Sequence, residues 1–167
     1  MLAFQRVGVE SKQILHNLFE LYVHDMSEWF GIETRADGSF GHDTSSYWSG
    51  DCAVFLAKRG EALAGFAVVG SAEQWLGKRE ARDIKEFFVL RAHRHAGVAD
   101  AMAQHLWNEF PAEWIVRVLA TNKPAVPFWR RSVRAYTNGV YEDRSPHERG
   151  RDWVHLRFDN RRTEDGD

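Results

Sequence analysis

The stretch IKEFFVLRAHRHAGVAD, residues 84–100, decides the fold because it joins a strand pattern to a helix pattern through a turn of small residues. Residues 83–90 form a nearly continuous apolar run, typical of a central strand that is covered on both faces. Val98, Met102, Leu106 and Phe110 then recur at helical spacing. The turn therefore lies at the N-terminus of a helix, where several backbone N–H groups have no partner within the helix.

Such a turn is suited to binding an anion. Unpaired N–H groups and the positive end of the helix dipole favour phosphate at this position. Gly97 lets the backbone approach a ligand without an intervening Cβ, and the small Ala96 and Ala99 serve the same end. The residues alone predict a phosphate or pyrophosphate cradle, and they leave a plain strand-to-helix turn open as the alternative.

Strand and helix patterns alternate along the rest of the chain. Strands are expected at 4–9, 53–58, 62–69, 114–120 and 152–158, and a short helix at 124–132. A first helix is expected to follow Ser11 as its N-cap, with a buried stripe of Ile14, Leu18, Leu21, Tyr22, Met26 and Trp29. Residues 31–51 form a long loop with room for one short helix, and a loop of that length is usually functional. The order predicts a mixed sheet flanked by helices.

Composition limits the possible functions. The 167 residues fit one domain, expected at 1–160, with a polar tail at 161–167. The net charge of −2 and the sequence pI near 6.4 disfavour binding to nucleic acid or to an anionic membrane. No stretch approaches the length of a membrane helix, and the first residues show no signal-peptide pattern. With a single cysteine, Cys52, these features predict a cytoplasmic protein.

Two motifs at a fixed separation carry a resemblance. The first is FFVLRAHRHAGVA at 87–99, and the second is VRVLATNKPAVPFWRR at 116–131. Together they resemble the GNAT superfamily of acyl-CoA-dependent N-acyltransferases, in the first motif through Val89, Arg94, Gly97 and Ala99, and in the second through Asn122, Ala125, Phe128 and Trp129. The resemblance implies an α/β (α+β) GNAT fold, with a mixed central sheet of about six to seven strands flanked by helices.

The resemblance also implies a site for acetyl-CoA. The backbone of Phe88, Val89 and Leu90 is expected to pair with the pantetheine arm as an added strand does. The pyrophosphate is expected on the N–H groups of Arg94, His95, Ala96, Gly97, Val98 and Ala99. Asn122 and Phe128 are expected to contact the pantetheine, although a turn or cap role for Asn122 and plain core packing for Phe128 are alternatives.

The chain departs from the family pattern at two positions. Asp100 follows the motif where many members have a basic residue, and its carboxylate either faces the diphosphate or points to solvent. Trp129 stands where the family usually has a tyrosine that protonates the departing thiolate, and an indole does not ionise usefully. Tyr136 is the candidate replacement acid. Tyr141, the attacking amine's own proton and water are the alternatives.

The acceptor amine must be neutral to attack a thioester, so a general base is expected. Glu86, inside the apolar run, is the first candidate, with a structural ion pair as the alternative. Asp83, nearer the start of the strand and expected to be more solvated, is the second. An acceptor pocket suited to a cationic, partly apolar amine is expected around the first helix and the long loop, at His24, Asp25, Trp29, Tyr47 and Trp48, together with His42 and Asp43.

The function expected from the sequence is direct transfer of an acetyl group from acetyl-CoA to an amine in a ternary complex. The alternative is a GNAT-fold protein that has lost catalysis and binds acyl-CoA as a sensor or partner module. No histidine or cysteine spacing matches a zinc motif, so no metal is expected. The amine acceptor, a small molecule or a peptide, is not identified by the sequence, and a homodimer is left open.

Overall fold

The strands form a mixed sheet in a computed structural model that describes residues 1–161. Hydrogen bonds order the described strands β1-β2-β3-β4-β5-β8-β6, with β7 paired to β8, and β4 runs parallel to β5. The strands are β1 (Leu2–Val7), β2 (Ala53–Arg59), β3 (Ala62–Ser71), β4 (Arg82–Val89), β5 (Glu113–Leu119), β6 (Glu142–Arg144), β7 (His147–Glu148) and β8 (Arg151–Asp159). The helices are α1 (Lys12–Phe30), α2 (Glu73–Leu76), α3 (Val98–Glu109) and α4 (Ala125–Tyr136). The expected fold class is confirmed, with α2, β6 and β7 added to the expected elements.

Contacts within the chain gather into two compact units. Unit 1 comprises residues 1–69 and 85–99, and unit 2 comprises residues 70–84 and the chain from residue 100 onward. Each unit is therefore built from segments far apart in the sequence. The single domain expected over 1–160 stays a prediction, and the tail expected at 161–167 lies, except for Arg161, outside the described residues.

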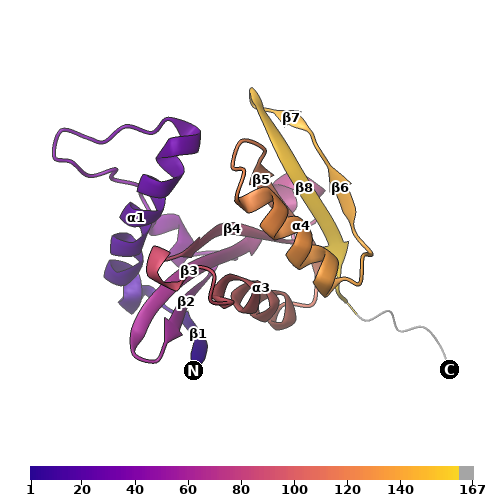
Figure 1. Ribbon diagram of the computed structural model, residues 1–167, viewed down its shortest axis with the longest axis horizontal. Helices are drawn as coiled ribbons and strands as arrows, with labels where there is room; N and C mark the ends of the chain where they lie inside the picture. The colour runs from indigo at the N-terminus through magenta and orange to yellow at the C-terminus, as the bar shows by residue number, and fades with distance from the viewer. Residues whose placement is uncertain (162–167) are drawn as a thin grey trace. The chain divides into compact units, whose positions relative to one another are not determined.

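In unit 1, α1 covers the antiparallel strands β1, β2 and β3 (Figure 1). The buried helix side chains are Leu15, Leu18, Phe19 and Val23, which form one core cluster with Val54, Leu56, Phe66, Val68 and Phe88. The expected stripe is correct at Leu18, which is buried, and at Tyr22, which packs on this cluster, but it is wrong at Ile14 and Leu21, which are 39% and 51% exposed. Apolar residues occupy two neighbouring stripes of this helix, so spacing alone did not show which one faces the sheet. Ser11 precedes α1 as expected but makes no side-chain cap.

Gly65 allows β3 to pass unusually close to the end of β4. A Cβ at this position would lie 2.1 Å from the carbonyl oxygen of Phe88. Next to it, the amide of Leu90 donates to the carbonyl of Ala64 at 2.8 Å. The end of β4 is thereby fixed at the point where the cradle turn begins.

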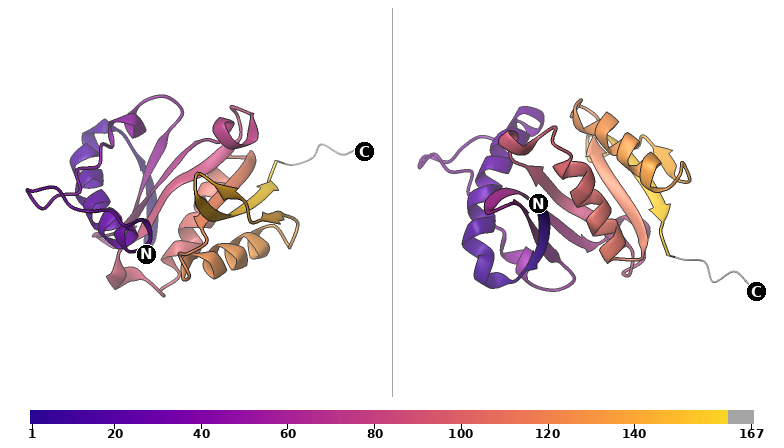
Figure 2. Two further views of the ribbon diagram at one scale, coloured as in Figure 1. Left: turned by 90° about the horizontal axis from the view of Figure 1, so that it is seen from above. Right: turned by 60° about the horizontal axis from the view of Figure 1, so that its bottom comes forward.

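In unit 2, α4 packs along β5 and β8, as Figures 1 and 2 show. Trp107, on α3, is fully buried and contacts Trp129, Tyr136 and Phe158, with ring centroids 6.3, 4.8 and 5.4 Å away. Met102 and Leu106, predicted as the buried stripe of this helix, are fully buried as well. This aromatic core holds α4 in place and with it the second motif.

Candidate active site

The turn between β4 and α3 has an unusual backbone. A single 3-10 turn at Arg91–His93 is followed by two residues with positive φ, His95 at 61° and Gly97 at 76°. A left-handed conformation at a residue other than glycine costs roughly 1 kcal/mol, so surrounding structure must hold His95 in place. Left-handed residues in a turn can direct neighbouring N–H groups toward one concave side, which suits an anion. Residues 94–97 are exposed.

The need for glycine at position 97 is conformational. A Cβ there would meet no atom within 4 Å, so steric crowding by the protein does not exclude a side chain. The positive φ does favour glycine. The space beside Gly97 is open, and the expected approach of a ligand there stays a prediction.

Arg94 fastens the turn to the end of β4. Its Nε donates to the carbonyl of Val89 at 2.9 Å, and its guanidinium lies 5.8 Å from the ring centre of Phe88. Its amide donates to the carbonyl of Arg91 at 3.2 Å. The expectation that the Arg94 amide binds pyrophosphate is therefore revised, because that amide already has a partner within the turn.

Asp25, on α1, holds the same turn from the other side. Its carboxylate accepts hydrogen bonds from Arg91, at 2.7 Å, and from Arg94. Burial acts to raise the pKa of Asp25, but the hydrogen bonds from Arg94 and Arg91 outweigh it and lower the pKa below its ordinary value. Asp25 was expected in the acceptor pocket. The structure places it instead as an ionic anchor of the cradle turn.

The Asp100 carboxylate is partly exposed and pairs with groups on α4. Ser132, on α4, donates its hydroxyl to one oxygen of Asp100, and Arg131 lies 3.5 Å from the other. The carboxylate therefore connects the first turn of α3 to α4. Its charge near the helix N-terminus is offset by the neighbouring guanidinium.

The structure brings Glu86 and Tyr47 together, from segments 39 residues apart. The Tyr47 hydroxyl donates to Oε1 of Glu86 at 2.6 Å in a partly buried position. Burial, and then the negative charge of Glu86, raise the pKa of Tyr47 well above its usual range. The phenol therefore stays protonated and acts as a donor to the carboxylate.

The other residues expected in the acceptor pocket are dispersed. His24 lies 6.2 Å from the ring of Phe40, while Trp29 and Trp48 are half-buried. Trp48 packs on the core of unit 1. His42 stacks on Phe19 with ring centroids 4.6 Å apart. Among the residues expected in the acceptor pocket, Tyr47 donates a hydrogen bond to Glu86.

Asp83 is fully buried and not solvated as expected. It pairs with Arg117 on β5, at 2.6 Å from Nη2 and 3.2 Å from Nε. The Arg117 guanidinium also lies 4.0 Å from the ring centre of Trp75. The pair is a packed internal salt bridge, which favours a structural role for Asp83 over that of a general base.

Asn122 and Phe128 begin the second motif in unit 2. The side-chain oxygen of Asn122 accepts the amide of Ala125 at 3.3 Å, which supports the cap role. Its amide nitrogen remains suited to a ligand carbonyl. Phe128 is half-buried and lies edge-on to Trp129 at 4.9 Å. Because its ring is partly exposed, plain core packing does not account for it.

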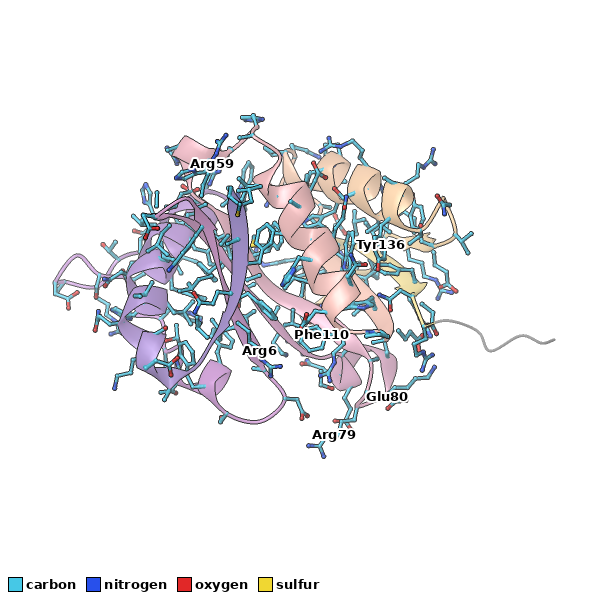
Figure 3. The ribbon with its side chains drawn as sticks, turned by 90° about the horizontal axis from the view of Figure 1, so that it is seen from below. Arg6, Arg59, Arg79, Glu80, Phe110 and Tyr136 are labelled. Carbon is cyan, nitrogen blue, oxygen red and sulfur yellow. The ribbon has the colours of Figure 1, made fainter. Side chains whose placement is uncertain are left out.

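Tyr136, labelled in Figure 3, is the last residue of α4, whereas Phe128 lies near the start of that helix. Eight residues separate the two, which is about 12 Å along a helix. The Tyr136 hydroxyl donates to Asn108 at 2.9 Å and accepts from Asn160 at 3.2 Å. These contacts indicate a structural role at the C-terminal ends of α3 and α4, and they revise the expectation that Tyr136 is the general acid.

Neither a metal site nor a membrane-spanning helix is found among residues 1–161. In this range no three His, Cys, Asp or Glu side chains are grouped so as to hold a metal ion. No helix of the same range has the length and apolar character needed to cross a membrane.

The chain is similar to known acetyltransferases. Residues 15–133 match the acetyltransferase (GNAT) family. A Bacillus subtilis acetyltransferase in complex with CoA superposes with a TM-score of 0.60 at 13% identity, covering 95% of this chain and 99% of that one. Spermidine N-acetyltransferase from Vibrio cholerae, in complex with CoA and spermine, gives 0.65 at 15% identity and 95% coverage of both chains.

A third solved structure also matches over nearly the full length of both chains. The ribosomal-protein-S18-alanine N-acetyltransferase from Escherichia coli superposes with a TM-score of 0.59 at 15% identity, covering 99% of this chain and 98% of the other. At these identities the superpositions show the fold. A search of the curated proteins finds no match to this chain.

Proposed function

Because this chain belongs to the acetyltransferase (GNAT) family, we propose that it transfers an acetyl group from acetyl-CoA to an amine, directly and within a ternary complex. The observation that carries the proposal is the exposed turn at 94–97, with positive φ at His95 and Gly97, which leads into the N-terminus of α3. The cytoplasmic location expected from the sequence remains part of the proposal.

The pyrophosphate of acetyl-CoA would lie on the amides that follow Arg94. His95, Ala96 and Gly97 supply backbone N–H groups on the exposed turn, and Val98 and Ala99 supply N–H groups of the first turn of α3. The end of β4 at Phe88, Val89 and Leu90 would pair with the amides of the pantetheine arm. The family resemblance assigns contacts with CoA to Asn122 and Phe128, and that assignment remains part of the proposal.

Glu86 would accept a proton from the acceptor ammonium. Only the neutral amine has a lone pair to attack the thioester, so a carboxylate beside the acceptor raises the reactive fraction. Tyr47 donates a hydrogen bond to the same carboxylate, and such a bond favours the charged form. The thiolate that departs is only mildly basic, with a pKa of roughly 8.5 for a comparable thiol. Water can therefore protonate it, and no phenol is required at Trp129.

Release of free thiol from acetyl-CoA in the presence of amines tests the proposal. The amine panel should include spermine, which is bound in the Vibrio cholerae structure, and an alanine peptide with a free amine, since another similar structure is a ribosomal-protein-S18-alanine N-acetyltransferase. Amine-dependent thiol release and an acetylated product are expected with at least one acceptor. Tight acetyl-CoA binding without turnover on any amine would favour the alternative, a GNAT-fold protein that binds acyl-CoA as a sensor or partner module.

The first prediction concerns Glu86→Gln, which keeps the shape of the side chain and removes its basicity. Turnover at neutral pH should fall by about 100-fold, the usual contribution of a general base, while KM for acetyl-CoA stays near its original value. Glu61→Gln, at the exposed β2–β3 turn, is the matched control. An unchanged rate and pH profile in Glu86→Gln would assign the base to another group.

A further inference from the structure

Tyr47 contacts Glu86 from the α1–β2 segment, residues 31–52. Figure 1 shows this segment as a long loop after α1. Within it, Tyr47 belongs to a short 3-10 helix at Ser45–Trp48. The phenol ring lies 5.9 Å from the ring of Phe19 on α1, and His42 of the same segment stacks on Phe19 at 4.6 Å.

A carboxylate on α1 fixes the segment at a second point. Glu20 accepts hydrogen bonds from the amides of Phe40, at 2.8 Å, and Gly41, at 2.9 Å. Arg35 closes the tip of the segment by donating to the carbonyl of Gly41 at 2.8 Å. Two consecutive residues of α1, Phe19 and Glu20, therefore dock the segment and determine where the Tyr47 hydroxyl lies.

We propose that Tyr47 is the positioning residue of the general base: its phenol holds the Glu86 carboxylate in one orientation and favours its ionised form. This inference rests on the proposed function, in which Glu86 takes the proton of the acceptor amine. It makes the α1–β2 segment, through Tyr47, part of the catalytic machinery.

The chemistry of the contact supports this assignment. A hydrogen bond donated to a carboxylate favours the charged form and lowers the pKa of the acid. Burial and the Glu86 charge keep the Tyr47 phenol protonated, so it donates a hydrogen bond without transferring its proton. Cys52, of the same segment, also acts to raise the pKa of the Tyr47 phenol. Tyr47 therefore orients the Glu86 carboxylate and favours its charged form. The phenol does not itself take a proton from the amine.

Carbon-13 NMR of glutamate-labelled protein tests the inference without an acceptor. Glu86→Gln identifies the Glu86 carboxyl signal by its loss. In Tyr47→Phe the midpoint of that signal should move to higher pH by about one unit, the equivalent of one hydrogen bond to a charged group. Tyr141→Phe, which removes a phenol from unit 2, should leave the midpoint in place. An unchanged midpoint in folded Tyr47→Phe overturns the inference.

Kinetics with an amine that the enzyme acetylates then distinguishes positioning of Glu86 by Tyr47 from stabilisation of the fold by Tyr47. The acid limb of kcat/KM should move to higher pH in Tyr47→Phe together with the NMR midpoint. A uniform drop of the whole profile with the limb in place would mean that the phenol only stabilises the fold, and would contradict the inference. If Glu86→Gln retains full turnover while the NMR midpoint still shifts in Tyr47→Phe, the proposed base is wrong and the contact is structural.

Discussion

Asp25 lies on α1, outside the turn at 91–97, and its carboxylate holds that turn through Arg91 and Arg94. Asp25→Asn should weaken the hold of α1 on Arg91 and Arg94 and raise the Kd for acetyl-CoA by several-fold, since the turn would lose part of its order before binding. Titration calorimetry measures the change. Asp37→Asn, on an exposed loop carboxylate of the same unit, is the control. Equal affinity in wild type and Asp25→Asn would show that the anchor is dispensable.

The pKa of Asp25 bears on the conditions for that measurement. Because it is lowered below its ordinary value near 3.8, the carboxylate is ionised at every pH above that value. The stability that it contributes is present above the unfolded pKa and is lost only as the pH falls through the lower folded pKa. The anchor is thus intact throughout the neutral range.

Sequence reasoning identified single residues unevenly. Glu86 was identified because a carboxylate inside an apolar strand is costly unless it is paired or faces a cleft. Tyr47 was identified because it lies in a long loop rich in aromatic residues. The contact between them could not be predicted, since it depends on how α1 docks residues 40–42. Asp25 was assigned to the wrong group for the same reason: its partners lie 66 and 69 residues away, and no spacing pattern links them.

At the scale of elements, β8 carries a half-buried histidine, His155, that makes stability depend on pH. His155 pairs across the ladder with Arg117 of β5 and lies edge-on to Trp75 of α2, at 6.2 Å. Burial lowers the pKa of His155, more than the charge of Glu148 raises it. Within residues 1–161 its Nε2 is buried without a hydrogen-bond partner.

Unfolding should therefore become easier on mild acidification. The unfolded chain binds a proton on this histidine near pH 6.5 and the folded chain does so only at lower pH, so the stability is present above 6.5 and declines as the pH falls. The slope contributed by one such group is at most about 1.4 kcal/mol per pH unit. Urea unfolding between pH 5 and 8 should show it in wild type and in the exposed-site variant His16→Gln, and not in His155→Gln. Identical profiles in all three would contradict the assignment.

Elements were predictable where periodicity and length agreed. The stripe of Val98, Met102 and Leu106 gave α3 correctly, and the apolar runs gave β2, β3, β4 and β5. The helix α2 and the strands β6 and β7 are too short to show a period, and β6 is exposed throughout. On α1 the period was found but not the face, because apolar side chains continue around the helix from Leu18 to Val23.

For the whole molecule, the two motifs and the order of the elements predicted the fold, because each motif places its residues on a defined strand end and helix start. The division into two compact units was not predicted. It depends on contacts between segments such as 1–69 and 85–99, and a single sequence carries no sign of which distant segments meet.

The central claim, that the turn before α3 binds the pyrophosphate of acetyl-CoA, is tested most directly by titration calorimetry on Gly97→Glu. The space around position 97 is open, so the variant should fold, and the backbone conformation there costs a side chain roughly 1 kcal/mol. Gly97→Ala carries the same backbone cost without the charge. Acetyl-CoA should bind the wild type, bind Gly97→Ala slightly less well, and bind Gly97→Glu at least about tenfold less well, a difference of roughly 1.4 kcal/mol. Wild-type affinity in folded Gly97→Glu, or no binding to the wild type, would contradict the claim.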